Sequence, residues 1–209
     1  MRFLGFLLVV WCLGLTACGP EFDEPTARCA QSCAGCCSGD TCFDGTGNEA
    51  CGAGGAICDR CGGFATCTWH AEGGRTCFFD RNERWLIEPV AAEISEVDPD
   101  DGESWDVDGS PPDVVVELFC PNGGRDIETR TSEDESYLPE WTDGGCTTTL
   151  GELSRARITI HVIDADLISS DIIYMGSRSV GAEDLAAGSF FISFPDQEGG
   201  LEVWLTRVP

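Results

Sequence analysis

Apolar and polar residues alternate in short runs along the second half of the chain. The clearest run, RITIHVI at 157–163, combines a period of two with β-branched side chains, which is typical of a half-buried strand. Turns rich in Gly, Pro and Asp separate it from similar runs. The pattern predicts eight strands, at residues 85–94, 114–119, 127–131, 147–150, 158–163, 172–175, 190–194 and 201–206.

Eight short strands in about 125 residues indicate an all-β fold, an eight-stranded antiparallel β-sandwich over residues 84–209. Only residues 180–187 have a pattern that fits a helical turn. Three tryptophans on predicted strands or turns, Trp85, Trp141 and Trp204, are expected to pack in the sandwich core. His161 in the middle of a strand and His70 nearer the N-terminus have no suitably spaced partner and are not expected to bind metal.

The N-terminus has the features of an export signal. Arg2 precedes an apolar stretch at residues 3–15 that is too short to span a bilayer as a mature helix. The stretch ends in LTAC at 15–18, which resembles the bacterial lipobox. That resemblance implies a lipoprotein signal peptide at residues 1–17 and lipidation of Cys18, with residues 18–28 as an acidic tether. An ordinary secretory signal ending at Ala17 is the alternative.

Export determines how the remaining cysteines are interpreted. Of the 14 cysteines, Cys12 lies in the signal and Cys18 is the lipidation site, which leaves an even number for disulfides in an oxidising compartment. Residues 29–78 carry too few large apolar side chains for a self-sufficient core, so we expect a disulfide-knotted cysteine-rich module. The expected disulfide cysteines are Cys29, Cys33, Cys36, Cys37, Cys42, Cys51, Cys58, Cys61, Cys67, Cys77, Cys120 and Cys146.

The pairing of these cysteines does not follow from the sequence, except that Cys120 and Cys146 most simply join two strands of the sandwich. Zinc is the competing interpretation for Cys33-x-x-Cys36 and Cys58-x-x-Cys61, which have finger-like spacing. Small knotted modules serve as spacers, protease inhibitors or receptor-binding units, and the sequence leaves these uses open.

The charge of the chain excludes one class of partner. The formal net charge is −25 and the sequence contains no lysine, whereas nucleic acids require a basic surface. A polybasic patch for anionic lipid is disfavoured for the same reason. The chain also has no Gly-x-Ser-x-Gly, no His-Glu-x-x-His and only two histidines, so we do not expect an enzyme.

Carboxylates follow the clearest strand directly, in the segment DADLISSD at 164–171. Three carboxylates on one short loop can converge on a point, and a site made of oxygen ligands alone suits a hard cation such as calcium. A solvated acidic rim without metal is the alternative.

Around this segment the chain resembles the C2 domain, a calcium-dependent phospholipid-binding β-sandwich. WDVDGSPPDVVV at 105–116 is similar to the first calcium loop, LPEWTD at 138–143 to the family's Asn-Pro-x-Trp-Asn-Glu segment, and DxD at 164–166 with DIIYMG at 171–176 to the third calcium loop. The resemblance implies calcium ligands at Asp106, Asp113, Asp164, Asp166 and Asp171. It also implies membrane contact through Leu167 and Ile168.

The chain departs from the family pattern in three places. The third loop is one residue short, Val114 and Val115 replace the usual Pro and Tyr, and no basic strand is available for phosphoinositides. We therefore expect an outer-membrane lipoprotein whose C2-like domain makes a calcium-dependent contact with a lipid surface or a protein. The alternative is a metal-independent adhesion or assembly protein that binds a partner through the cysteine-rich module.

Overall fold

Alternating burial along the strands defines the fold of the second half of the chain. The computed structural model describes residues 22–209, except 72–73, 100–101, 107, 167–169 and 196. All eight predicted strands are confirmed, several of them longer than predicted. They are β7 (Arg84–Glu93), β8 (Asp113–Asn122), β9 (Arg125–Arg130), β11 (Cys146–Thr149), β12 (Ile158–Ala165), β13 (Ser170–Arg178), β14 (Ser189–Ser193) and β15 (Gly200–Val208).

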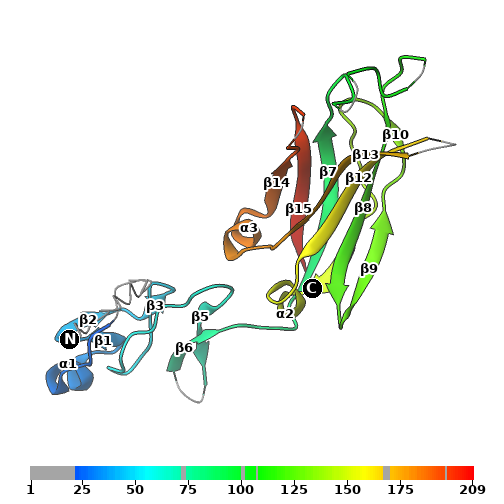
Figure 1. Ribbon diagram of the computed structural model, residues 1–209. Coiled ribbons are helices and arrows are strands. Elements are labelled where there is room, and N and C mark those ends of the chain that lie inside the picture. Colours follow the sequence, from blue (N-terminus) through cyan, green and yellow to red (C-terminus); the bar gives the residue numbers. More distant parts are fainter. Residues whose placement is uncertain (1–21, 72–73, 100–101, 107, 167–169, 196) are drawn as a thin grey trace, which may run out of the picture. The chain divides into compact units, whose positions relative to one another are not determined.

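These strands form two antiparallel sheets packed face to face (Figure 1). One sheet has the order β11-β7-β15-β14. The other has the order β10-β8-β12-β13, where β10 (Asp134–Glu135) is a short strand that the sequence pattern did not predict. Strand β9 also pairs with β8, so β9 and β10 occupy successive stretches of the same edge of β8. The predicted all-β antiparallel sandwich is confirmed.

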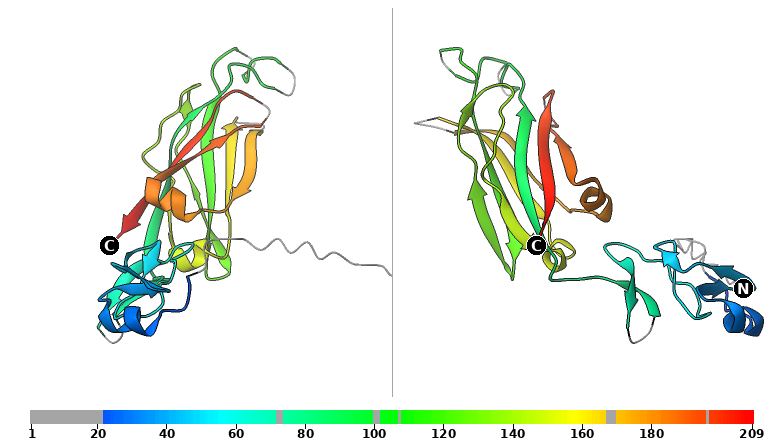
Figure 2. Two further views of the ribbon diagram at one scale, coloured as in Figure 1. Left: turned by 90° about the vertical axis from the view of Figure 1, so that its left-hand side faces the viewer. Right: turned by 180° about the vertical axis from the view of Figure 1, so that it is seen from behind.

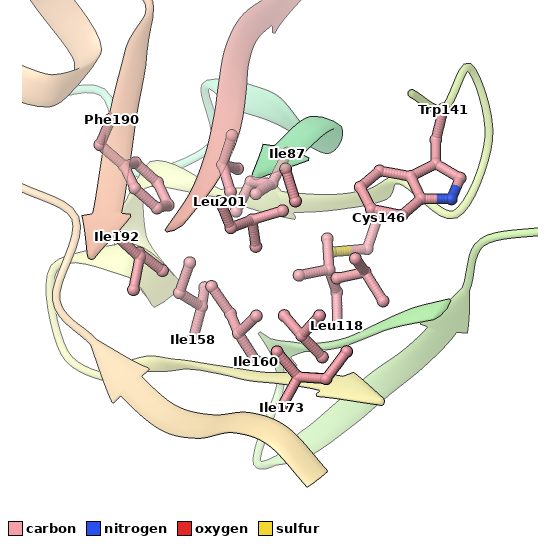
Figure 3. Packing of buried hydrophobic residues seen from close by; sticks show 14 of the residues in the cluster. Ile87, Leu118, Trp141, Cys146, Ile158, Ile160, Ile173, Phe190, Ile192 and Leu201 are labelled. Atoms are coloured by element: carbon pink, nitrogen blue, oxygen red, sulfur yellow. The ribbon is translucent and has the colours of Figure 1, made fainter. Parts of the chain in front are cut away.

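The core lies between the two sheets and is built from alternate residues of each strand. Ile158, Ile160 and Val162 of β12 are fully buried, while the residues between them are only partly covered. Figure 3 shows Ile158 and Ile160 packed near Ile192. The period of two in the sequence therefore corresponds directly to the inward and outward faces of the sheet.

A disulfide joins the two sheets. Cys120 of β8 and Cys146 of β11 are bonded, and both are buried in the core. This agrees with the expected link between strands.

The prediction that three tryptophans lie in the core is wrong for one of them. Trp141 is buried and Trp85 packs against the core while partly covered, but Trp204 is 51% exposed. The physical reason is the alternation along β15, in which Val203 and Leu205 face inward and Trp204 between them faces outward.

Two short helices connect strands. α2 (Leu150–Leu153) follows β11 directly, and α3 (Ala182–Ala187) lies within the predicted helical turn. The carboxylate of Asp184 accepts the Gly181 N–H at 2.8 Å and so caps α3, while Arg178 binds its other oxygen at 2.5 Å. Gly188 ends the helix at φ 76°, a conformation that favours glycine.

The N-terminal region is held by disulfides between short elements. These elements are α1 (Ala27–Ser32), β1 (Cys36–Ser38), β2 (Thr41–Phe43), β3 (Thr46–Gly47), β4 (Ala50–Cys51), β5 (Thr66–His70) and β6 (Gly74–Phe78). They pair as three two-stranded sheets, β1-β2, β3-β4 and β5-β6.

The pairing of the cysteines, which the sequence left open, is largely defined by the structure. The bonds are Cys29–Cys37, Cys33–Cys42, Cys36–Cys58 and Cys61–Cys77, and Cys51 and Cys67 are also disulfide-bonded. All four sulfurs of the two zinc-like Cys-x-x-Cys pairs are thus in disulfides, which rules out those pairs as zinc ligands in the oxidised chain.

The chain divides into two compact units. One comprises residues 1–60 and 69–76, and the other comprises residues 61–68 and 77–209, so that the β5-β6 hairpin contributes to both. Figure 2 shows the sandwich in two further views. In the part of the chain that the structure describes, no helix is both long and apolar enough to cross a membrane. The predicted signal peptide and the predicted lipidation site, Cys18, lie outside the described residues.

Candidate metal site

A carboxylate occupies the end of the core-facing row of β12. Ile158, Ile160 and Val162 face the core, and the next residue in this alternation is Asp164, whose exposure is 0%. An ionised carboxylate in such a position loses hydration and needs compensating partners. The sequence has therefore placed a charge where the strand pattern would otherwise continue with an apolar side chain.

Only one of the two carboxylate oxygens of Asp164 has a hydrogen-bond partner among the described residues. Its Oδ1 accepts the backbone N–H of Asp113 at 2.8 Å. Its Oδ2 is buried and has no hydrogen-bond partner among the described residues. A buried oxygen with free lone pairs is an available ligand for a cation.

The fold brings the other four predicted ligands to the same end of the sandwich. Asp113 begins β8, and its neighbour Val114 lies opposite Asp164 in the sheet, while Asp171 of β13 lies opposite Asp164 on the other side. Asp166 follows the end of β12, and its carboxyl is within hydrogen-bonding range of Asp106, which comes from the β7–β8 connection. Segments about fifty residues apart in sequence thus lie at the same end of the sandwich.

Burial and mutual repulsion raise the pKa of three of these carboxyl groups. Burial, followed by the negative charges of Asp166, Asp106 and Asp113, raises the pKa of Asp164 to about 6, although the Asp113 N–H acts in the opposite direction. Burial and neighbouring carboxylates, including Asp106, also raise the pKa of Asp113 and of Asp166. Clustered carboxylates with raised pKa values indicate a place where positive charge would be stabilising.

Trp105 anchors the β7–β8 connection in the core, directly before the predicted calcium ligand Asp106. The indole of Trp105 is 8% exposed, belongs to the core cluster, and donates from Nε1 to the Ser95 carbonyl at 2.8 Å. Asp106 follows it directly. The Ser110 hydroxyl lies 3.0 Å from Asp106 Oδ2 and 2.8 Å from Asp108 Oδ1, which orients this part of the loop.

The donor set fits a hard cation, but the carboxylates do not form a closed cage. Calcium takes six to eight oxygen ligands at about 2.3–2.6 Å, and five carboxylates from two loops can provide most of them. Among the described residues, three or more potential ligand atoms lie within 4.8 Å of one another only in two groups of cysteines, whose sulfurs are in disulfides. The carboxylates would therefore have to move closer together around an ion.

Several residues at this end were not assigned a role from the sequence. Trp105 and Ser110 support Asp106, and the charge of Glu133 contributes to the raised pKa of Asp113. Leu138 is 66% exposed, and the nearby Ser136 N–H donates to the carbonyl of Pro112, directly before Asp113. The sequence signal that could have identified Leu138 is its place as the first residue of the LPEWTD motif.

The remaining predicted residues fall into two groups. Leu167 and Ile168, the expected membrane-contact pair, lie outside the described residues. His161 is on the outer face of its sheet, with Nδ1 3.5 Å from Glu117 Oε2 and its ring 4.9 Å from that of Phe119. These contacts explain His161 as a structural residue, as the sequence indicated.

Comparison with known proteins identifies similar structures but no family. No protein-family model matches the sequence, and no curated protein is significantly similar to it. A solved C2 domain aligns with 61% of this chain and 100% of its own length, at 15% identity and a TM-score of 0.42. A C2 domain of plant extended synaptotagmin 1 aligns with 62% of this chain and 97% of its own, at 15% identity and a TM-score of 0.43.

A third similar structure holds two such domains. The calcium-bound pair of C2 domains of extended synaptotagmin 2 aligns with 62% of this chain and 47% of its own length, at 14% identity and a TM-score of 0.43. All three of these solved structures are C2 domains, and each is 14% or 15% identical to this chain.

Proposed function

We propose that this chain is an exported, lipid-anchored protein whose β-sandwich binds calcium and uses the bound ion to contact a lipid surface or a protein. The observation that carries the proposal is Asp164, a fully buried carboxylate near four other aspartates. One of its oxygens has no hydrogen-bond partner among the described residues. A purely solvated acidic rim would leave its carboxylates in water, where each is hydrated.

Calcium suits this donor set better than magnesium. The carboxylates come from separate segments and stand apart, and calcium accepts irregular geometry with six to eight oxygen ligands. Magnesium requires near-ideal octahedral geometry and keeps several waters. The proposed ligands are Asp106, Asp113, Asp164, Asp166 and Asp171.

Binding would reverse the local field at this end of the sandwich. Without metal, the clustered carboxylates repel anionic headgroups and acidic protein surfaces; one or two divalent ions offset that charge. Leu138 and Ile172, both exposed, lie on segments adjacent to Asp113 and Asp171 and add apolar area for a contact. The sequence motifs that resemble the C2 calcium loops support the same use, and Leu167 and Ile168 would join them.

The proposed lipid anchor bears on which surface the calcium site would contact. Lipidation of Cys18 would attach the chain to its own membrane, and by the lipobox sorting rule Gly19 directs it to the outer membrane. A chain that is already attached needs no calcium to reach that bilayer, so the calcium site would act on a second surface or on a protein. The proposal includes no catalytic activity.

Isothermal titration calorimetry tests the metal site directly. Calcium chloride is titrated at pH 7.5 into the chain from Gly19 onward, produced with its disulfides formed, and magnesium chloride is titrated in parallel. We expect calcium to bind with a dissociation constant on the order of 10⁻⁴–10⁻³ M, the usual range for extracellular modules. Asp164→Asn should weaken binding at least ten-fold.

The matched control is Asp126→Asn, because Asp126 is an exposed aspartate on β9 of the same sandwich and lies outside the carboxylate cluster. It removes the same charge and should bind calcium as the unchanged chain does. No calcium heat from the unchanged chain, or an equal loss in both variants, would overturn the metal site. A partner captured equally with and without chelator would favour the metal-independent alternative instead.

A further inference from the structure

Two large aromatic side chains on the outer face of the β11-β7-β15-β14 sheet are exposed to solvent. Phe191 of β14 is 54% exposed and Trp204 of β15 is 51% exposed. Their sequence neighbours Phe190, Val203 and Leu205 face the core, so the alternation of each strand turns these rings toward solvent. Exposed aromatic rings of this kind are enriched at sites of molecular recognition.

Two carboxylates stand beside these rings in the same face. In the sheet register, Glu202 lies opposite Phe191 and Glu88 lies opposite Trp204. Directly opposed side chains on one face of an antiparallel pair are about 4.5–5.5 Å apart, so the four residues form a compact checkerboard. We call Phe191, Glu202, Trp204 and Glu88 the aromatic–carboxylate patch.

A hydrogen bond orients the tryptophan within the patch. Trp204 Nε1 donates to Glu202 Oε1 at 2.8 Å. The polar edge of the indole is therefore engaged, and half of the side-chain area remains exposed. A carboxylate bonded to the indole edge also increases the negative potential of the ring face, which is the part of an indole that attracts cations.

Three other aromatic rings of the chain each have an arginine guanidinium over them. Arg75 lies 6.0 Å from the ring centroid of Trp69, Arg81 lies 5.8 Å from that of Phe79, and Arg178 lies 4.4 Å from that of Phe190. No arginine in the described part of the chain is positioned in this way over Phe191 or Trp204, and the sequence has no lysine. The patch thus combines two rings and two carboxylates with no internal cation over the rings.

We propose that the aromatic–carboxylate patch binds a lysine- or arginine-bearing segment of a partner protein. Cationic side chains would stack on the faces of Trp204 and Phe191 while Glu88 and Glu202 neutralise them. The net charge of −25 strengthens the attraction over longer distance. Charge complementarity selects this occupant, because the two carboxylates attract a cationic segment by charge, give a neutral oligosaccharide no ionic attraction, and repel an anionic lipid surface.

The test measures binding of a defined basic peptide to the full chain, purified in detergent at 150 mM salt with chelator present. The probe is a capped peptide of alternating lysine and glycine, and calorimetry or anisotropy of a labelled peptide reports the affinity. Trp204→Ala and Phe191→Ala should each weaken binding about three- to thirty-fold, the loss expected for one cation–π contact. Glu88→Gln with Glu202→Gln should weaken it further and reduce its salt dependence.

Matched controls separate the patch from general charge attraction. Asp126→Asn with Glu128→Gln removes two charges from exposed positions of β9, and Met175→Ala removes an exposed apolar side chain from β13. Both should bind the peptide in the presence of chelator as the unchanged chain does, since the patch acts without calcium. Circular dichroism confirms that each variant is folded.

Three results would overturn the proposal. The first is equal weakening by the patch variants and the β9 variant, which would indicate non-specific attraction. The second is an affinity unchanged by Trp204→Ala. The third is binding of a neutral oligosaccharide or of anionic vesicles that Trp204→Ala abolishes while peptide binding stays intact, which would assign the rings to a different class of ligand.

Discussion

Asp164→Asn should make the metal-free protein more stable and remove its response to calcium. The wild-type carboxylate is fully buried, and its pKa rises from 3.8 to about 6. A difference of about two pKa units corresponds to about 3 kcal/mol by which folding disfavours the ionised form. Asparagine keeps an oxygen that can accept the Asp113 N–H and carries no charge, so up to this amount is recovered at neutral pH.

The stability that Asp164→Asn gains over wild type should increase as the pH rises from about 4 to about 6. Because the folded protein holds the Asp164 proton more tightly than the unfolded chain, wild-type stability falls as pH rises from about 4 to about 6 and then levels off in this respect. Below pH 4 the carboxyl is protonated in both states, and the difference between wild type and variant should disappear. The variant should lack this component of the pH dependence.

Calcium should narrow the difference in stability between the variant and wild type. At 5 mM calcium and a dissociation constant of about 0.1–0.5 mM, binding to the folded state adds roughly 1.4–2.3 kcal/mol to wild type. The variant should gain much less. Urea denaturation followed by tryptophan fluorescence measures both effects, since Trp105 and Trp141 are buried in the sandwich and report its unfolding.

The matched control is again Asp126→Asn, which should leave both the metal-free stability and the calcium response unchanged. If Asp164→Asn destabilised the metal-free protein at pH 7.5, the reasoning would be refuted, because it would mean that the ionised carboxylate stabilises the fold. A calcium response retained in full by the variant would separately refute the assignment of Asp164 as a ligand.

Three further substitutions test contacts that stabilise the sandwich and support the proposed metal site. Replacing Cys120 and Cys146 together by alanine opens a bridge with a sequence separation of 26, which should cost about 3.5 kcal/mol in urea denaturation by loop entropy; an unchanged midpoint would contradict this. Trp105→Phe removes a 2.8 Å hydrogen bond and should cost about 1 kcal/mol while weakening calcium binding several-fold in calorimetry, because the next residue is a proposed ligand. Asp184→Asn loses the charge of a buried helix cap bonded to an arginine and should lower thermal stability by about 1–3 kcal/mol; a neutral effect would show that the cap tolerates an amide.

The eight strands of the sandwich were predictable from the sequence because a strand with one buried face requires alternation. The same alternation, applied residue by residue to β15, would have placed Trp204 outside, since Leu201, Val203 and Leu205 already form the inward row. The prediction that Trp204 packs in the core did not apply this alternation. The aromatic–carboxylate patch therefore follows from the sequence pattern once it is applied strictly, although its carboxylates become neighbours of the rings only through the sheet register.

Other features lie beyond local sequence signals. Strand β10 has only two residues and exists because β8 offers an unpaired stretch of edge beyond β9. The disulfide pairs of the N-terminal region depend on which short elements meet, and spacing alone allows many pairings.

The sequence by itself determined the alternating strands, the excess of acidic residues and the presence of carboxylates at the ends of particular runs, since these depend on residue type and position. Only the tertiary structure decided that Asp164 is fully buried, that one of its oxygens lacks a partner among the described residues, and that Asp106 reaches Asp166 from a distant loop. The reason is that burial and charge proximity depend on how strands pair in space. A carboxylate in a row of core residues becomes a candidate ligand only when the sheets close around it.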